Sequence, residues 1–184
     1  MRHRHIHEKL LFILLVMLFA TGMLVGCSRT GAENTNEQVI QKVLELQFSG
    51  PDEEFMDAMW NPEYKKVVDG KEENEVFDRF VQEAYGDYFT ESELDTFVRA
   101  FGTQYPSTAH SNGYKLDLKN VSIEQTEQAS NRYEFIAQVG YQKDGGKEET
   151  AKVEGAIFFS TKEEGKIGRF QYSKDESLIE SLSR

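Results

Sequence analysis

Few side chains in this sequence could carry out chemistry by themselves. Cys27 is the single cysteine among 184 residues, and three of the four histidines, His3, His5 and His7, stand in the first seven positions. The fourth, His110, follows hydroxyl residues in the stretch PSTAHSN. A serine and a histidine act as a catalytic pair only with a third orienting group and a defined geometry. We therefore expect His110 to be a solvated loop residue, and no catalytic residue is predicted.

Cys27 stands at the boundary between an apolar and a polar segment. The basic stretch MRHRHIHEK precedes the uncharged run Leu10–Gly26. A basic start, an apolar middle and small residues near a cleavage site are typical of a secretory signal. The run also reaches the lower limit of what spans a bilayer, so an uncleaved membrane anchor is the alternative.

The four residues Leu24-Val25-Gly26-Cys27 resemble the lipobox of bacterial lipoproteins. The resemblance implies that Cys27 receives a diacylglycerol thioether and becomes the new N-terminus. A thiolate is a nucleophile suited to such an attachment, and two acyl chains hold a protein on a membrane where one chain binds only weakly. We expect a signal peptide over residues 1–26, a lipidated cysteine with a polar tether over residues 27–36, and a single domain over residues 37–184. The domain would stand at the extracytoplasmic face of the cell membrane.

The charge of the chain restricts its partners. Removal of residues 1–26 takes away Arg2, Arg4, Lys9 and Glu8, and lowers the formal net charge from −11 to −13. Nucleic-acid binding needs Lys and Arg to neutralise phosphates, so a nucleic-acid partner is not expected. The same acidity disfavours lying flat on an anionic bilayer. The membrane partner is therefore expected to be reached through the lipid anchor alone.

The first half of the domain has apolar residues at helical spacing. Thr35 with Gln38 predicts a capping box, and Pro51 suits the first position of a helix. Thr90 with Glu93 predicts a second capping box. The expected helices run around Val39–Leu44, from Pro51 to Trp60, from Val76 to Gly86 and from Thr90 to Gly102, with a loop over residues 103–113.

The second half alternates with a period of two, which is typical of half-buried strands. Four strands are expected around Tyr114–Ile123, Tyr133–Tyr141, Ala151–Phe159 and Ile167–Tyr172. The alternation slips by one residue near Lys119-Asn120, which predicts a β-bulge. Ser173 with Glu176 is expected to cap a short last helix. Helices followed by a meander predict an α+β fold, with N-terminal helices packed on a bent four-stranded antiparallel sheet.

This order of elements resembles the cone of the nuclear-transport-factor-like and cystatin-like superfamily. The segments FMDAMWNPEYKKVVDG and EAYGDYFTESELDTFVRAFG, placed before four strands, carry the resemblance. It implies a pocket between sheet and helices, where enzymatic members place an Asp, His or Tyr and where many other members only bind or assemble. His110 precedes the first strand instead of lying on a strand. This departure from the pattern of the enzymatic members argues against a histidine-dependent mechanism.

Aromatic residues near the expected helix ends are the candidate pocket residues. Tyr and Trp combine an apolar body with a polar tip and are common in ligand pockets. Aromatic stripes at helical spacing normally pack inside, so a place in the core is the favoured reading. The candidates are Trp60, Tyr64, Tyr85, Tyr88, Phe101 and Tyr105.

Clusters of acidic residues raise the hypothesis of a calcium site, since calcium prefers several oxygen ligands. No D-x-D-x-D-G loop occurs, however, and three clusters stand where helices are expected to begin. Carboxylates there offset the helix dipole. Neither a metal nor a cofactor is predicted.

These observations favour a non-catalytic binding or interaction module for an envelope protein or a small apolar ligand. One alternative is an enzyme with a buried Asp/Tyr proton-transfer site, in which apolar walls raise the carboxyl pKa. The other is a structural subunit of an envelope complex, which predicts an exposed apolar patch. An inward-facing carboxylate beneath a pocket would favour the enzyme, and a filled interior with surface carboxylates would favour binding.

Overall fold

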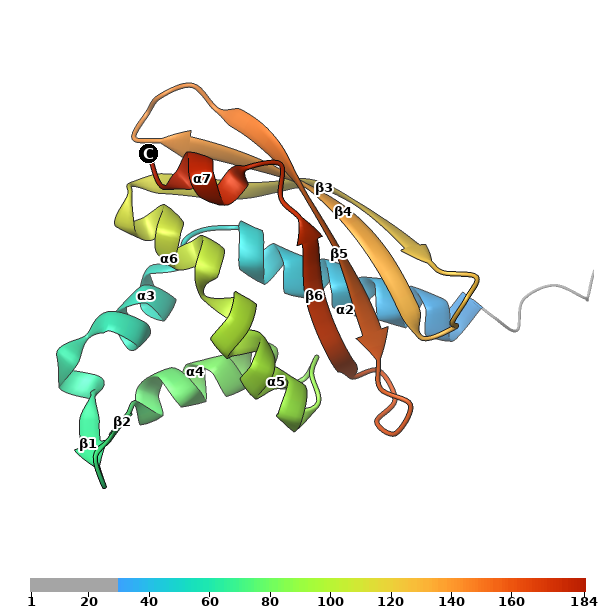
Figure 1. Ribbon diagram of the computed structural model, residues 1–184, viewed down its shortest axis with the longest axis horizontal. Helices are drawn as coiled ribbons and strands as arrows, with labels where there is room; N and C mark the ends of the chain where they lie inside the picture. The colour runs from blue at the N-terminus through green and yellow to red at the C-terminus, as the bar shows by residue number, and fades with distance from the viewer. Residues whose placement is uncertain (1–29) are drawn as a thin grey trace, which may run out of the picture. The chain divides into compact units, whose positions relative to one another are not determined.

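The structure is a computed structural model that describes residues 30–184, with side chains from Thr35 onward. Residues Thr35–Arg184 form one compact unit, and their architecture confirms the predicted α+β fold (Figure 1). The predicted signal segment, the lipobox and Cys27 lie outside the described residues.

Helix α2, Thr30–Phe48, opens the described chain. Its buried face contributes Ile40, Val43, Leu44 and Phe48 to the core. The helix begins before Thr35, so the predicted capping box is wrong, and α2 includes residues 30–36 of the segment predicted to be a polar tether. Helix propagation adds one hydrogen bond per residue once a nucleus exists, and the packed second half of α2 provides that nucleus.

The helices after α2 follow the sequence patterns closely. Asp52 accepts hydrogen bonds from Glu54 N and Phe55 N and so caps the next helix. Pro51 therefore precedes this helix and does not occupy its first position. The Thr90 hydroxyl accepts from Glu93 N at 3.3 Å, which confirms Thr90 as an N-cap. The elements are α3 Glu53–Trp60, the 3₁₀ turn Pro62–Tyr64, α4 Glu75–Tyr85, α5 Glu91–Phe97, the π-helical turn Val98–Gly102 and α6 Gln104–Ser111.

Two of these regions differ from the sequence-based expectation. Helix α6 occupies the segment expected to be a loop. A short hairpin, β1 Lys66–Val68 and β2 Lys71–Glu73, separates α3 from α4. Its turn places Asp69 and Gly70 at φ values of 51° and 78°, a conformation that Asp-Gly adopts readily.

The predicted meander is confirmed. The strands are β3 Tyr114–Gln125, β4 Arg132–Lys143, β5 Glu149–Phe159 and β6 Ile167–Lys174, antiparallel and in the order β3-β4-β5-β6. The register shifts between Leu118 and Asn120, where a bulge was predicted. The sheet is not closed into a barrel.

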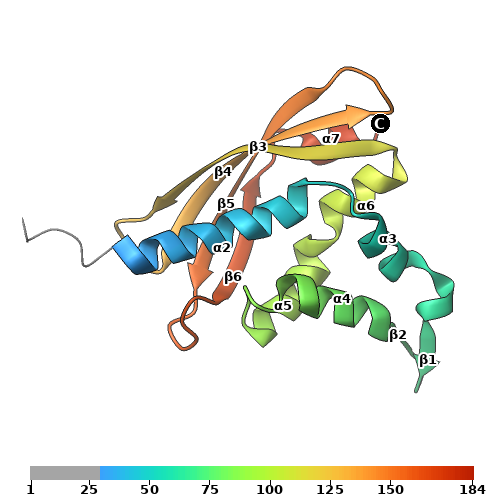
Figure 2. The ribbon, with the colours of Figure 1, turned by 180° about the vertical axis from the view of Figure 1, so that it is seen from behind.

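The helices cover one face of this sheet (Figures 1 and 2). Phe135 on β4 and Phe170 on β6 are buried on the covered side, with ring centroids 5.9 Å apart. Gly155 lies between their strands, and a Cβ there would stand 2.4 Å from the Phe135 ring. Because Gly155 has no side chain, the Phe135 ring can lie against β5 at this position.

The short last helix, α7 Leu178–Leu182, buries both of its terminal leucines. Its first turn is held by Asp175, whose carboxylate accepts from Ser177 N and Ile179 N at 3.1 and 3.2 Å. The predicted Ser173–Glu176 cap is wrong, because Ser173 still belongs to β6.

Both edges of the sheet are partly occupied by other parts of the chain. At the β3 edge, Gly50 and Leu116 exchange two backbone hydrogen bonds of 3.1 and 2.6 Å. At the β6 edge, Ile167 exchanges backbone hydrogen bonds with Tyr88 and Thr90. Further along β6, the Glu93 carboxylate accepts from Phe170 N at 2.7 Å, so a side chain takes the place of a strand.

The C-terminus of α4 is capped by a side chain from the β5–β6 loop. Lys166 Nζ donates to the carbonyl oxygens of Gly86 and Asp87 at 2.8 and 2.7 Å. Gly86 stands at the predicted end of this helix but keeps right-handed dihedral angles. Its lack of a side chain instead gives room to Gln82, whose amide would stand 2.0 Å from a Cβ at Gly86.

Candidate functional site

The aromatic residues predicted to line a pocket are dispersed through the structure. Tyr85 and Tyr105 are buried in the core, as the favoured reading expected. Tyr88 and Phe101 are half-buried against it. Trp60 is 55% exposed at the end of α3, and Tyr64 is half-exposed in the turn that follows. The six side chains therefore do not line one common pocket.

The space between sheet and helices is filled with rings. Phe97 meets Phe170 edge-on at 4.9 Å between centroids, and Phe48 lies 5.1 Å from Tyr105. Tyr172 stands edge-on to both Tyr105 and Phe170, at 5.3 and 4.9 Å. Edge-to-face contacts of this kind are favourable beyond the apolar area they bury. The space between sheet and helices, where the resemblance implies a pocket, is thus occupied by the protein's own side chains.

Gln47 is the one buried amide in this interior, with 1% of its surface exposed. Its Nε2 donates to the Tyr85 hydroxyl at 2.9 Å and to the Gly102 carbonyl oxygen at 3.1 Å. Its Oε1 accepts from the Tyr172 hydroxyl at 3.4 Å. The Gly102 carbonyl can only accept, so it fixes the orientation of the amide. Gln47 with Tyr85, Tyr172 and Gly102 is called the Gln47 network below.

A tyrosine and an aspartate do meet at the end of the interior. The Tyr105 hydroxyl donates to Asp175 Oδ2 at 3.2 Å. Burial, followed by the Asp175 charge, raises the pKa of Tyr105 well above its ordinary value of 10.0. The tyrosine therefore stays protonated as a donor, while Asp175 also caps α7. The pair has a structural role.

A cleft lies outside the ring-filled interior, between the end of α2 and helices α3 and α4. It has a volume of about 240 Å³. We call it the α2–α4 cleft. Its walls are mainly apolar, with polar side chains at the mouth. The lining residues are Lys42, Glu45, Leu46, Gln47, Ser49, Gly50, Pro51, Asp52, Phe55, Phe80, Ala84, Tyr85, Pro106 and Leu116.

Tyr85 is the candidate pocket residue that lines this cleft. Burial raises the pKa of Tyr85 to about 12, and the hydrogen bond from Gln47 opposes that rise. The hydroxyl is therefore protonated at neutral pH and can donate. It connects the α2–α4 cleft to the Gln47 network.

Charged side chains at the mouth are already engaged. Lys42 Nζ lies 3.5 Å from Glu45 Oε2, and Gln41 Nε2 donates to Glu45 Oε1 at 3.1 Å. Asp52 is occupied in capping α3. The mouth therefore carries neighbouring charges of both signs.

His110 belongs to the last turn of α6, not to a loop. Its Nε2 lies 3.6 Å from Glu53 Oε2, beside an open hollow of about 400 Å³. The histidine side chain is 38% exposed and the glutamate 84%. Both groups are solvated, in agreement with the expectation for His110.

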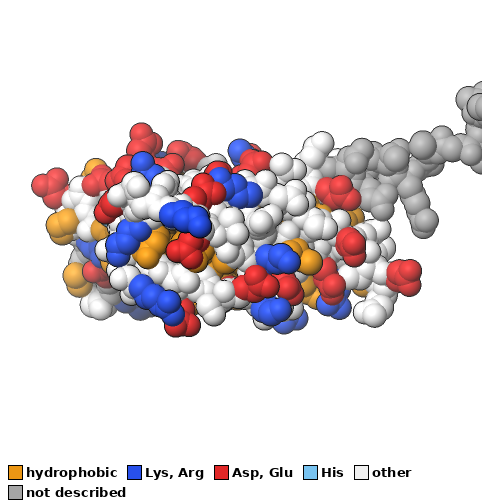
Figure 3. Space-filling model, turned by 90° about the horizontal axis from the view of Figure 1, so that it is seen from above, with side chains coloured by type: hydrophobic (Ala, Val, Ile, Leu, Met, Phe, Trp, Pro, Cys, Tyr) orange, Lys and Arg blue, Asp and Glu red, His pale blue; other side chains and the backbone are white. Residues whose placement is uncertain are grey.

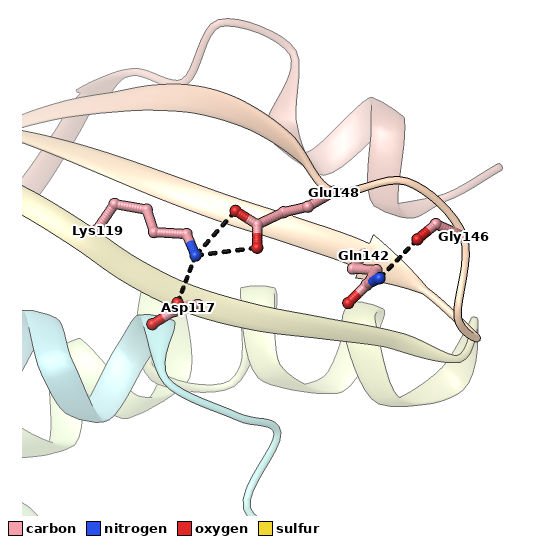
Figure 4. A network of polar contacts seen from close by, with 5 residues as sticks. All are labelled: Asp117, Lys119, Gln142, Gly146 and Glu148. Atoms are coloured by element: carbon pink, nitrogen blue, oxygen red, sulfur yellow. Dashed lines mark hydrogen bonds and ion pairs between the residues drawn. The ribbon is translucent and has the colours of Figure 1, made fainter.

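A cluster of three charged side chains lies at the bulge of β3 (Figure 4). Lys119 Nζ contacts Asp117 Oδ2 at 2.6 Å and Glu148 Oε1 at 2.8 Å. Nearby, Gln142 Nε2 donates to the Gly146 carbonyl oxygen at 2.5 Å. A Cβ on Gly140 would stand 2.5 Å from Lys119 Cε, so the glycine makes room for the lysine chain. The Lys119 charge is thus paired with two carboxylates of the same cluster. Exposed ion pairs of this kind contribute little to the stability of the fold.

The surface is mixed in charge. Figure 3 shows acidic and basic side chains interspersed over the face that is seen there. Within residues 35–184, no three His, Cys, Asp or Glu side chains converge in a way that could hold a metal ion. Every helix of residues 30–184 is too short or too polar to cross a bilayer.

Comparison with protein families, with curated proteins and with solved structures finds no match to this chain.

Sequence reasoning missed the α2–α4 cleft and Gln47. The sequence does contain a signal for Gln47, because it falls on the apolar stripe of α2 with Val43, Leu44 and Phe48. A lone amide at such a position has to find buried partners. The cleft left no such signal, because its walls come from separate helices, from β3 and from the turn at Gly50.

Proposed function

We propose that this chain is a lipid-anchored protein of the cell envelope whose folded unit binds a ligand or partner and catalyses no reaction. The anchor is inferred from Leu24-Val25-Gly26-Cys27 and from the signal-like segment before it. Cys27 would carry the lipid, and the unit would face away from the cytoplasm.

The observation that carries the binding proposal is the filled interior. Aromatic rings occupy the space between sheet and helices, and every Asp and Glu of residues 35–184 keeps some exposure. Proton transfer by a carboxyl group with a raised pKa needs that group inside an apolar pocket. The Tyr105–Asp175 pair is used in capping α7, so it lends no support to the enzyme alternative.

A second candidate function is a contact with another envelope protein. Trp60, Val67 and Val68 are exposed large apolar residues, and the two valines lie on the β1–β2 hairpin. Asn36, where the chain enters the unit, donates to the Tyr133 hydroxyl at 3.4 Å. In both ribbon views the hairpin projects from one end of the folded unit (Figures 1 and 2).

The anchor is tested by expressing the full chain in a bacterium that processes lipoproteins and feeding it an alkyne-tagged fatty acid. We expect the tag on Cys27 and on a mature chain that begins there. Cys27→Ser should abolish both labelling and cleavage. A chain that keeps residues 1–26 and stays in the membrane unlabelled would refute the proposal.

Binding is tested by native mass spectrometry of the mature chain purified from its own host. Extra mass that is lost on denaturation would identify a retained ligand and its chemical class. A bare mass, combined with specific crosslinks to one envelope protein, would favour the second candidate. Turnover of a retained molecule would overturn the non-catalytic proposal.

A further inference from the structure

We propose that the α2–α4 cleft binds a small, uncharged, largely apolar molecule whose buried end accepts a hydrogen bond from the Tyr85 hydroxyl. This inference rests on the proposed binding function and names its site and ligand class.

The Tyr85 hydroxyl has an unused hydrogen. Gln47 Nε2 donates to the hydroxyl oxygen at 2.9 Å, so that contact uses the oxygen as the acceptor. The Gly102 carbonyl prevents the amide from turning over, because Nε2 must stay where both oxygens can accept from it. Among residues 35–184, no acceptor takes the hydrogen of the Tyr85 hydroxyl. A phenol carries both a donor and acceptor sites, and a buried donor normally finds a partner.

The cleft has the size and walls for a small apolar body. Its volume of about 240 Å³ corresponds to roughly eight water molecules at liquid density. Phe55 and Phe80 come from two helices, and their ring centroids are 5.5 Å apart. Leu46, Ala84 and Leu116 complete the apolar wall. Such walls favour a ring or a short branched chain over a cluster of waters.

The mouth favours a ligand without net charge. Lys42 and Glu45 form an ion pair there, and Asp52 caps α3. A charged ligand would meet a like charge beside each opposite charge, and it would leave water for an apolar wall. Burying an unpaired charge costs far more than burying one carbonyl that is hydrogen-bonded.

Acetophenone and α-methylstyrene are the probes that test this arrangement. The two molecules have nearly the same shape, but only acetophenone has a carbonyl oxygen that can accept from Tyr85. The full chain is placed in lipid nanodiscs, and leucine methyl NMR signals are followed during titration. Leu46 and Leu116 report on the cleft, whereas buried Leu178 on α7 reports on unrelated change.

We expect saturable shifts at Leu46 and Leu116, with acetophenone binding about 3- to 10-fold more tightly than α-methylstyrene, the ratio that one neutral hydrogen bond supplies. Tyr85→Phe should abolish this preference and leave the binding of α-methylstyrene unchanged. Tyr172→Phe is the matched control, because Tyr172 also bonds Gln47 but does not line the cleft. It should keep the preference.

Ala84→Phe should fill the cleft and remove the saturable shifts of both probes, and the same nanodiscs then measure partitioning into lipid. The proposal is overturned by equal affinities for the two probes, by a preference that survives Tyr85→Phe, or by shifts that survive Ala84→Phe. A ligand retained in native mass spectrometry that Ala84→Phe does not displace would overturn the cleft while leaving the binding function intact.

Discussion

Replacing Gln47 with methionine should destabilise the fold through lost hydrogen bonds, since the two side chains have similar length and volume. The substitution removes the hydrogen bonds that Gln47 Nε2 donates to the buried Gly102 carbonyl oxygen and to the buried Tyr85 hydroxyl. Each buried polar group left unsatisfied costs about 1–3 kcal/mol, which gives about 4 kcal/mol for the pair. The added apolar burial of methionine offsets about 1 kcal/mol. We expect the free energy of unfolding to fall by about 3 kcal/mol.

Urea unfolding of the chain from Ser28 to Arg184, followed by far-UV circular dichroism, measures this loss. A domain of this size has a denaturant slope of about 2 kcal/mol per molar urea, so the midpoint should fall by about 1.5 M. The slope itself should stay constant, because the amount of surface exposed on unfolding is unchanged.

The decisive control is the same substitution in a chain that also carries Tyr85→Phe and Tyr172→Phe. Two of the three partners of Gln47 are then already apolar, and removal of both sides of a hydrogen bond can be nearly neutral. Gln47→Met should cost about 1–2 kcal/mol less in that background. An equal loss in both backgrounds would show that packing, and not the Gln47 network, accounts for the effect.

Three further measurements test other contacts. Lys166→Met should lower stability by about 1–2 kcal/mol because it uncaps α4, whereas Lys162→Met in the same loop should be nearly silent in thermal melts. Burial raises the pKa of Glu93 above 4.5, and the hydrogen bond from Phe170 N opposes that rise. The folded state therefore binds the Glu93 carboxyl proton more tightly than the unfolded state does. As pH rises from 4.5 towards neutrality, the stability of the wild-type protein should decline relative to that of Glu93→Gln. A difference in denaturation midpoints that stays constant with pH would refute this. Because the Tyr85 pKa is about 12, a pH titration followed by absorbance at 295 nm should show that Tyr85→Phe removes a group that titrates above pH 11. The stability of the wild-type protein should fall above pH 10, because Tyr85 ionises at lower pH in the unfolded chain than in the folded one.

The sheet was predictable because its signal is strong and local. Tyr133, Phe135, Ala137, Val139 and Tyr141 recur at every second position, with Ile136 as the apolar exception between them, and the slip near Lys119 marks the bulge. The β1–β2 hairpin was missed because all its residues are exposed, so no apolar alternation marks it. Helix α6 was missed because Pro106 suggests a break, yet it falls in the first turn, where a helix needs no N–H from it.

The placement of the aromatic side chains could be predicted only in part. Helical spacing correctly indicated a core position for Tyr85 and Tyr105. It could not show that Trp60, at the end of the same kind of stripe, points to solvent, because this depends on where Asn61-Pro62 turns the chain. The Tyr85 hydroxyl gained its significance from Gln47 and Gly102, which are far from it in sequence. Such partners are determined by tertiary packing alone.

The occupied sheet edges matter for how copies of this chain behave together. Proteins tethered to one membrane meet at high local concentration, where an open strand edge invites sheet-to-sheet aggregation. In this chain the backbone of Gly50 pairs with Leu116 near the start of β3, and the Glu93 carboxylate accepts a hydrogen bond from Phe170 N on β6. In the proposed tethered state, these contacts leave less of either sheet edge open to a neighbouring copy. Loss of the Glu93 contact would leave the Phe170 N–H at this edge free to pair with another strand.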